Sequence, residues 1–246
     1  MLKAAALAKA DGSAPTTADP SVSFFTMSAV DKAYFFYKNT QWQKLAELLV
    51  DAGLMVRNAK APHASADAYK ICVNRMVGML ALTAIHDIMK VPELLPTVQK
   101  KHDGYSGFSA GDLIHDHDIA LGYILEHYKD TLSSFTRLSK DLQQTVRFTQ
   151  VKLAFNHGWF VQAEAPPGPM MRQLKHTINT SGSIRSSDVA FYFVHWLTDL
   201  AGAEPTPLRG SEKFVQKFPH AVLQSFISSF SVVGTLVDKT ETQVGH

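Results

Sequence analysis

Histidine and aspartate stand side by side as His86 and Asp87, inside the mostly apolar stretch LALTAIHDIMKV of residues 80–91. An imidazole nitrogen and a carboxylate oxygen are metal ligands, and a bound cation offsets the cost of burying a carboxylate. The alternative is a salt bridge from Asp87 to Arg75 or Lys90. In that alternative His86 is a core histidine that is satisfied by neighbouring protein groups and binds no metal. We interpret the pair as candidate metal ligands.

Two later segments carry further imidazoles at places where a helix is expected. GDLIHDHDIALGYILEHY, residues 111–128, sets His117 within the inner face of a helix and His115 at its margin. His157 ends the next expected helix, where a favourable interaction with the helix dipole is the alternative explanation. A solvated HDHD run is the alternative for the first segment. These histidines are candidate ligands for the same ion.

A fourth group of polar residues lies in SSDVAFYFVHWLTDLAG, residues 186–202. On a helical wheel its members, Asp188, Tyr192, His195 and Asp199, fall within about 60° of one another. The stripe contains no Lys, Arg or Glu, which a solvated face usually carries. It is either one wall of a polar site or an exposed stripe. In a site, His195 and Asp199 would act as acid–base or orienting groups.

The elements that must position these residues are predicted to be helices, because the Val/Ile/Thr alternation typical of strands is nearly absent. We expect an all-α fold, a single compact helical domain over residues 23–246 with roughly eight or nine helices. Residues 1–22 are expected to be a flexible lead-in or a cut from a longer chain, and Asp112 is expected to cap a helix. The helices are predicted over residues 28–37, 40–56, 66–90, 112–128, 139–157, 169–180, 187–202, 211–217 and 219–236.

The composition is that of an ordinary globular protein, with 46% hydrophobic residues and a formal net charge of +2. So small a charge gives no case for a nucleic-acid or membrane-surface partner. The single cysteine, Cys72, fits a reducing compartment, and no apolar run approaches the roughly 18 residues that span a bilayer. We therefore expect a cytoplasmic protein with no nucleic-acid or membrane partner; a homodimer is compatible with the sequence.

The quoted residues resemble the HD-domain superfamily of metal-dependent phosphohydrolases. TAIHDIMKV is similar to the hallmark of that superfamily, with Met89 in a slot where glycine is common. HDIALGYIL, residues 117–125, is similar to a histidine helix of the HD-GYP branch, although the GYP signature is absent: HDGYSGF at 102–108 comes too early and lacks the proline. The resemblance covers about residues 60–205 and does not support membership of that branch.

The resemblance implies a set of metal ligands on separate helices. They are His86, Asp87, His117 with His115 as the competitor, His157, and Asp188 with Asp199 as the alternative, while His63 is the only candidate for the upstream histidine of the family. The implied cofactor is one or more divalent ions, with Fe, Mn, Zn and Mg not distinguished. Lys90 would then act on a phosphate of the substrate.

The function implied is hydrolysis of a nucleotide or another small phosphate ester. Arg209, Lys213 and Lys217 recur every four residues and would hold a second anionic group of a small phosphorylated molecule, a solvated basic face being the alternative. HD-like di-iron oxygenases resemble the same arrangement. A third reading is a non-catalytic HD-like module that binds a ligand or partner.

Overall fold

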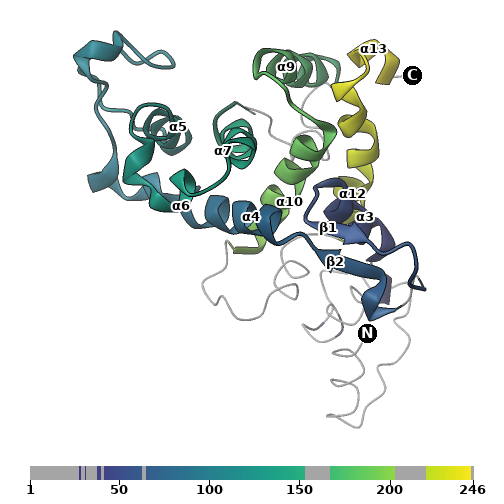
Figure 1. Ribbon diagram of the computed structural model, residues 1–246. Coiled ribbons are helices and arrows are strands. Elements are labelled where there is room, and N and C mark those ends of the chain that lie inside the picture. The colour runs from purple at the N-terminus through teal and green to yellow at the C-terminus, as the bar shows by residue number, and fades with distance from the viewer. Residues whose placement is uncertain are drawn as a thin grey trace.

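The computed structural model describes residues 28, 31, 38–39, 42–62, 65–152, 167–202 and 220–244 (Figure 1). Within these ranges the chain is mostly helical, as expected from the sequence. The α-helices are α3 (Trp42–Asp51), α4 (Val73–Ile85), α5 (His117–His127), α6 (Ser133–Thr136), α7 (Lys140–Arg147), α9 (Pro167–Thr180), α10 (Ser186–Gly202), α12 (His220–Val233) and α13 (Glu241–Val244). A π-helix, η7 (Phe148–Lys152), continues α7, and short 3-10 turns cover Ala66–Ala68, Ile88–Lys90, Pro92–Leu94, Lys100–His102, Lys129–Thr131 and Gly234–Val237.

Two short strands occupy positions that the sequence assigned to helices. β1 (Met55–Arg57) pairs antiparallel with β2 (Tyr69–Ile71), with Met55 opposite Ile71. The helix predicted to reach residue 56 ends at Asp51, and Gly53 follows with φ of 71°, a left-handed conformation that suits glycine. The helix predicted over 66–90 is therefore wrong in its first turns, and α4 begins only at Val73.

The start of α5 also differs from the prediction. Asp116, not Asp112, caps this helix, because its carboxylate accepts hydrogen bonds from the N–H groups of Asp118 and Ile119. The carboxylate of Asp112 instead accepts from the N–H of Ser109 in the preceding loop. His117 therefore becomes the first residue of α5.

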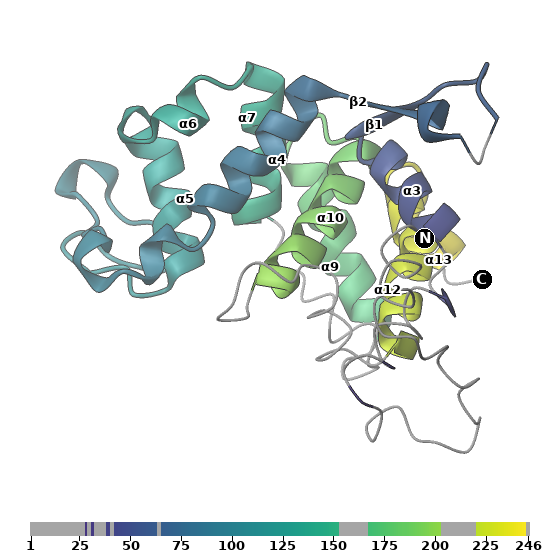
Figure 2. The same ribbon diagram turned by 90° about the horizontal axis from the view of Figure 1, so that it is seen from below.

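Helix α10 is the central element of the described structure. It packs against α3 on one side and against α4 and η7 on the other (Figure 2). Phe191 and Phe193 of α10 are fully buried, and each such side chain stabilises the fold by roughly 1.5–3 kcal/mol. The C-terminal half of α10 thus reaches the same region as the end of α4 and the start of α5.

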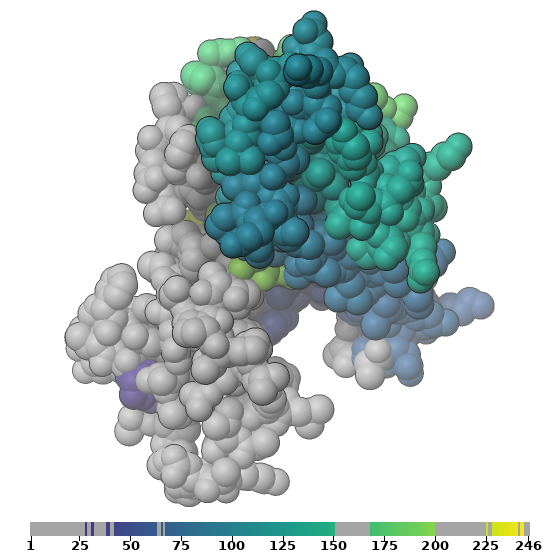
Figure 3. Space-filling view, turned by 90° about the vertical axis from the view of Figure 1, so that its left-hand side faces the viewer, coloured from purple at the N-terminus to yellow at the C-terminus, as the bar shows by residue number. Residues whose placement is uncertain are grey.

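The segment between α4 and α5 forms much of the described surface on one face of the molecule, dark teal in Figure 3. His102 of this segment stacks on His127 of α5 with ring centroids 3.8 Å apart, and its Nδ1 lies 2.7 Å from the Tyr123 hydroxyl. Tyr123 also accepts from the N–H of Gln99. These contacts fasten the long segment to α5.

Several predicted features lie outside the described residues. They are the lead-in 1–22, most of the predicted helix 28–37, the helix 211–217, and the site residues His63, His157, Arg209, Lys213 and Lys217.

None of the described helices combines the length and the apolar character needed to cross a bilayer.

Candidate metal centre

His86 stands at the C-terminal end of α4, and its two ring nitrogens have different neighbours. Nδ1 lies 2.8 Å from the carbonyl oxygen of Thr83. Nε2 lies 3.0 Å from Oδ1 of Asp199 and 3.6 Å from Oδ2 of Asp87. Because a carbonyl only accepts, Nδ1 must carry a proton, and Nε2 is the nitrogen that faces the two carboxylates.

Asp87 lies where α4 gives way to the 3-10 turn Ile88–Lys90, and its two oxygens face different partners. Oδ2 accepts a hydrogen bond of 2.7 Å from the Lys90 ammonium and is the oxygen nearer His86. Oδ1 lies 3.8 Å from Nε2 of His117. The side chain is 40% exposed and therefore lies at the edge of the site, with one oxygen toward each imidazole.

The first turn of α5 contributes a second group of ligand types. Nε2 of His117 lies 3.6 Å from Oδ1 of Asp118, and these two residues form a group with Asp116 in which the donor atoms lie within 4.8 Å of one another. Gln150 of the π-helix donates a 2.8 Å hydrogen bond to Oδ1 of Asp118. Burial raises the pKa of the Asp118 carboxyl. The charges of Asp116 and Asp87 raise this pKa further, whereas His117 lowers it.

Helix α10 contributes Asp199 and His195, one turn apart on the same face. His195 is 7% exposed, its ring meets the His86 ring edge-on at 5.0 Å, and its buried Nδ1 has no hydrogen-bond partner among the described residues. Burial, together with the charge of His86, lowers the pKa of His195 to about 4. His195 is therefore neutral near pH 7 and retains an available lone pair.

The protonation of His86 and the charge of Asp199 depend on each other. The hydrogen bond to Asp199 raises the pKa of His86 above 6.5 against the opposing effect of burial. The same bond lowers the pKa of the Asp199 carboxyl below 3.8. Donor atoms of His86, Asp87 and Asp199 lie within 4.8 Å of one another, so either a proton on Nε2 or a cation satisfies the facing lone pairs.

Of the residues predicted from the sequence, the structure brings together His86, Asp87, Lys90, His117, His195 and Asp199. The salt bridge from Asp87 to Lys90, which was the alternative to metal binding, is also present. Lys90 and Asp199 each contact one member of the His86–Asp87 pair, while His195 reaches it through the His86 ring.

Asp188, which was predicted as a metal ligand, is not part of this group. Asp188 is buried, and its carboxylate accepts hydrogen bonds from Arg75, Thr145 and Arg185. It lies eleven residues before Asp199 on α10, which is about 16 Å along a helix axis. Asp199, the alternative, is the aspartate that reaches His86.

His115 is also separate from the group. It is exposed, precedes the first residue of α5, and its ring contacts the edge of Phe108 with centroids 5.4 Å apart. Of the two competitors, His117 is the histidine that approaches Asp87.

Two residues of the group were not predicted from the sequence. Asp118 follows His117 directly, so the HDHD run contained the signal, but its side chain was not assigned a ligand role. Nothing in the sequence marked Gln150 as a site residue, because a glutamine in a predicted helix looks the same whether or not it lies at a site. Only the packing of η7 against α5 places it beside Asp118.

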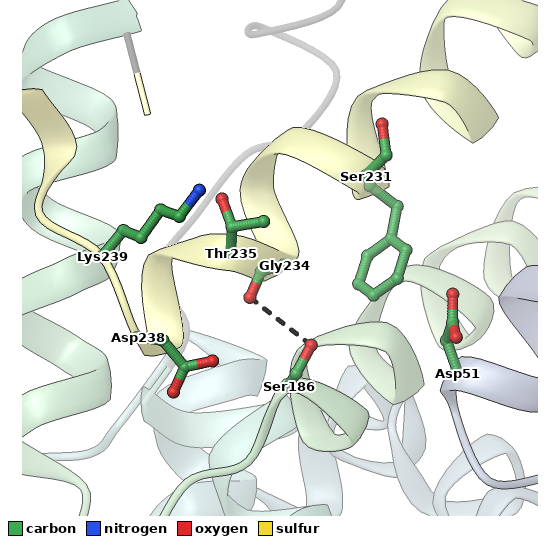
Figure 4. Close-up of a pocket in the computed structure, with 8 residues that line it drawn as sticks. Asp51, Ser186, Ser231, Gly234, Thr235, Asp238 and Lys239 are labelled. Atoms are coloured by element: carbon green, nitrogen blue, oxygen red, sulfur yellow. Dashed lines mark hydrogen bonds between the residues drawn. The ribbon is translucent and has the colours of Figure 1, made fainter. Parts of the chain in front are cut away.

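A separate hollow of about 280 Å³ lies between the end of α3, the start of α10 and the end of α12 (Figure 4). Asp51, Ser186, Phe230 and Asp238 are among its lining residues, and the Ser186 hydroxyl donates to the carbonyl of Gly234. The residues that line it include none of the candidate ligands, so the hollow is distinct from the metal centre.

Comparison of the chain with models of protein families, with curated proteins and with solved structures finds no match. The functional assignment therefore depends on the residues of the candidate metal centre.

Proposed function

We propose that the protein is a metal-dependent phosphohydrolase of the HD-domain type that acts on a nucleotide or another small phosphate ester. The observation that carries the proposal is the convergence of His86, Asp87 and Asp199 from two helices that are more than 100 residues apart in sequence, with donor atoms within 4.8 Å.

The donor set fits a divalent cation. A mixture of imidazole nitrogen and carboxylate oxygen suits Fe, Mn, Zn or Mg better than an ion that prefers thiolates. The Thr83 carbonyl fixes the proton on Nδ1 of His86, which leaves Nε2 as the ligand nitrogen. A hydrogen bond of this kind behind a histidine is the usual second contact of a metal-binding imidazole.

The two oxygens of Asp87 support two adjacent subsites. The first subsite consists of Nε2 of His86, Oδ2 of Asp87 and Asp199. The second subsite consists of Asp116, His117 and Asp118, whose donor atoms lie within 4.8 Å of one another, and Oδ1 of Asp87 lies 3.8 Å from Nε2 of His117 at its edge. Divalent ions held by these residues would supply an activated water and would neutralise charge on a phosphoryl group. Asp87 is shared by the two subsites.

Side chains around the subsites supply complementary functions. Lys90 pairs with Oδ2 of Asp87, so its ammonium competes for an oxygen of the first subsite, and once displaced it would be available to a phosphate of the substrate. His195 is neutral and buried against His86, so it keeps that ring in place without adding charge.

Lys90→Met is expected to strengthen Mn²⁺ binding and to weaken catalysis. An exposed ion pair of this kind is worth about 0.2–1 kcal/mol, which corresponds to an affinity gain of about 1.5- to 5-fold when the competing ammonium is removed. Loss of the same ammonium from the phosphate side lowers kcat/KM. Calorimetric titration with Mn²⁺ and initial rates of phosphate release measure the two effects, and weaker Mn²⁺ binding in the variant would contradict the competition.

Metal binding is expected to weaken as pH falls. His86 must lose the proton on Nε2 to act as a ligand, and its metal-free pKa is raised above 6.5. The affinity is therefore fully expressed above that raised pKa and falls by about tenfold per pH unit below it, because one proton displaces one ligand. Titrations with Mn²⁺ across this range check the slope. An affinity that does not change with pH would exclude His86 as a ligand.

The direct test is a metal analysis of the purified chain together with a screen for phosphate release from nucleotides and small phosphate esters. We expect bound divalent metal and phosphate release from at least one compound, both removed by a chelator and restored by Mn²⁺ or Fe²⁺. Metal-loaded protein without turnover on any phosphate ester would contradict the proposed reaction. Iron-loaded protein that consumes oxygen instead would point to a di-iron oxygenase.

A further inference from the structure

Gln150 lies in the π-helix η7 (Phe148–Lys152) and connects the two parts of the candidate metal centre. We propose that Gln150 is a positioning residue that orients Asp118 and thereby determines whether the second subsite is occupied. This inference rests on the proposed function and concerns only the second subsite.

A single nitrogen of Gln150 makes both connections. Nε2 donates to Oδ1 of Asp118 at 2.8 Å, and it lies 3.5 Å from the carbonyl oxygen of His86. The first contact has the length of a full hydrogen bond, whereas the second is at the limit of one. The amide therefore joins the end of α4, which bears His86 and Asp87, to the first turn of α5.

The π-helix accounts for the direction of this side chain. In an uninterrupted α-helix Gln150 would follow Val146 at i+4, and Val146 is fully buried in the core. The i→i+5 turn of a π-helix shifts that register, and such turns occur frequently at functional sites. Gln150 is half-buried and reaches the rim of the site, while Phe148 and Thr149, which precede it in the π-helix, remain in the core.

The chemistry of an amide suits a positioning role. Its N–H donates to the carboxylate without carrying a charge that would repel a cation, and it fixes one oxygen of a side chain that is 59% exposed. Without this donor Asp118 loses its hydrogen bond to η7 and is free to rotate into solvent. Loss of a contact behind a metal ligand typically reduces metal affinity by about 10- to 100-fold.

The test is calorimetric titration of the full chain with Mn²⁺, comparing wild type with Gln150→Leu. We expect two sites in the wild type, and in the variant an unchanged first site with a second site weakened by about 10- to 100-fold. The thermal midpoint without metal should be unchanged. Gln144→Leu, the same substitution at a half-buried glutamine on α7, is the matched control and should leave both sites unchanged.

Gln150→Asn provides a second variant, because it keeps an amide but shortens its reach by one methylene, and it should show the same selective loss. If either folded variant binds Mn²⁺ at both sites with the same affinities as the wild type, the positioning role is overturned while the proposed function stays intact. Equal weakening of both sites would also overturn it, since that result indicates a general structural role. A wild type that binds no Mn²⁺ would overturn both this inference and the proposed function.

Discussion

Asp87→Ala is expected to abolish divalent-metal binding at both subsites. Its two oxygens face His86 on one side and His117 on the other, so no other single carboxylate in the described structure serves both. Removing a ligand costs more than the loss of a contact behind it, so Mn²⁺ affinity should fall by more than about 100-fold. Elemental analysis and Mn²⁺ titration measure the loss, and metal-dependent phosphate release should disappear with it.

Two variants sharpen this expectation. Asp199→Ala should remove only the first subsite, because Asp199 contacts His86 and its donor atoms group with those of His86 and Asp87. Asp130→Ala, at an exposed aspartate before α6, should change neither and serves as the control. Full metal content in Asp87→Ala would show that its carboxylate has no part in a metal centre.

Asp188→Asn is expected to have the largest effect on stability, with little direct effect on the metal centre. The carboxylate of Asp188 lies 2.8 Å from the Arg75 guanidinium, and the side chains are 3% and 9% exposed. Removing one partner of such a buried pair leaves an uncompensated charge in the core and costs about 3–5 kcal/mol. Total stabilities are typically about 5–15 kcal/mol, so the variant should be close to unfolding. Urea unfolding of the metal-free chain measures the difference.

The exposed residue Asp238 supplies the matched control, because Asp238→Asn removes the same charge at the surface and should change stability by less than about 0.5 kcal/mol. A stability of Asp188→Asn equal to that of the wild type would show that the Arg75–Asp188 pair is not needed for folding.

The same pair predicts the acid limb of the stability curve. Burial alone would raise the pKa of Asp188, but hydrogen bonds from Arg185, Arg75 and Thr145 outweigh it and hold the pKa below 3.8. The contribution is therefore complete above pH 3.8 and is lost as pH falls through the folded-state pKa. The Asp188→Asn variant should lack this part of the acid unfolding.

The sequence predicted most of the helices that the structure describes, because apolar residues recur at helical spacing over long segments. It failed at β1 and β2, where each strand has three residues and their pairing across the intervening loop outweighs local preference. It also chose Asp112 over Asp116 as the cap of α5, since both are acceptable cap residues and only the path of the preceding loop distinguishes them.

Residue types and spacing alone were enough to select His86, Asp87, His117, His195 and Asp199 as residues with the chemistry of a metal or acid–base site, because imidazoles and carboxylates in apolar helices need partners. Which partner each one has was decided by the tertiary structure. A helical wheel gives the direction of a side chain but not its distance along the axis, so Asp188 and Asp199 looked equivalent in sequence. Packing of α10 against α4 then paired Asp188 with Arg75 and Asp199 with His86.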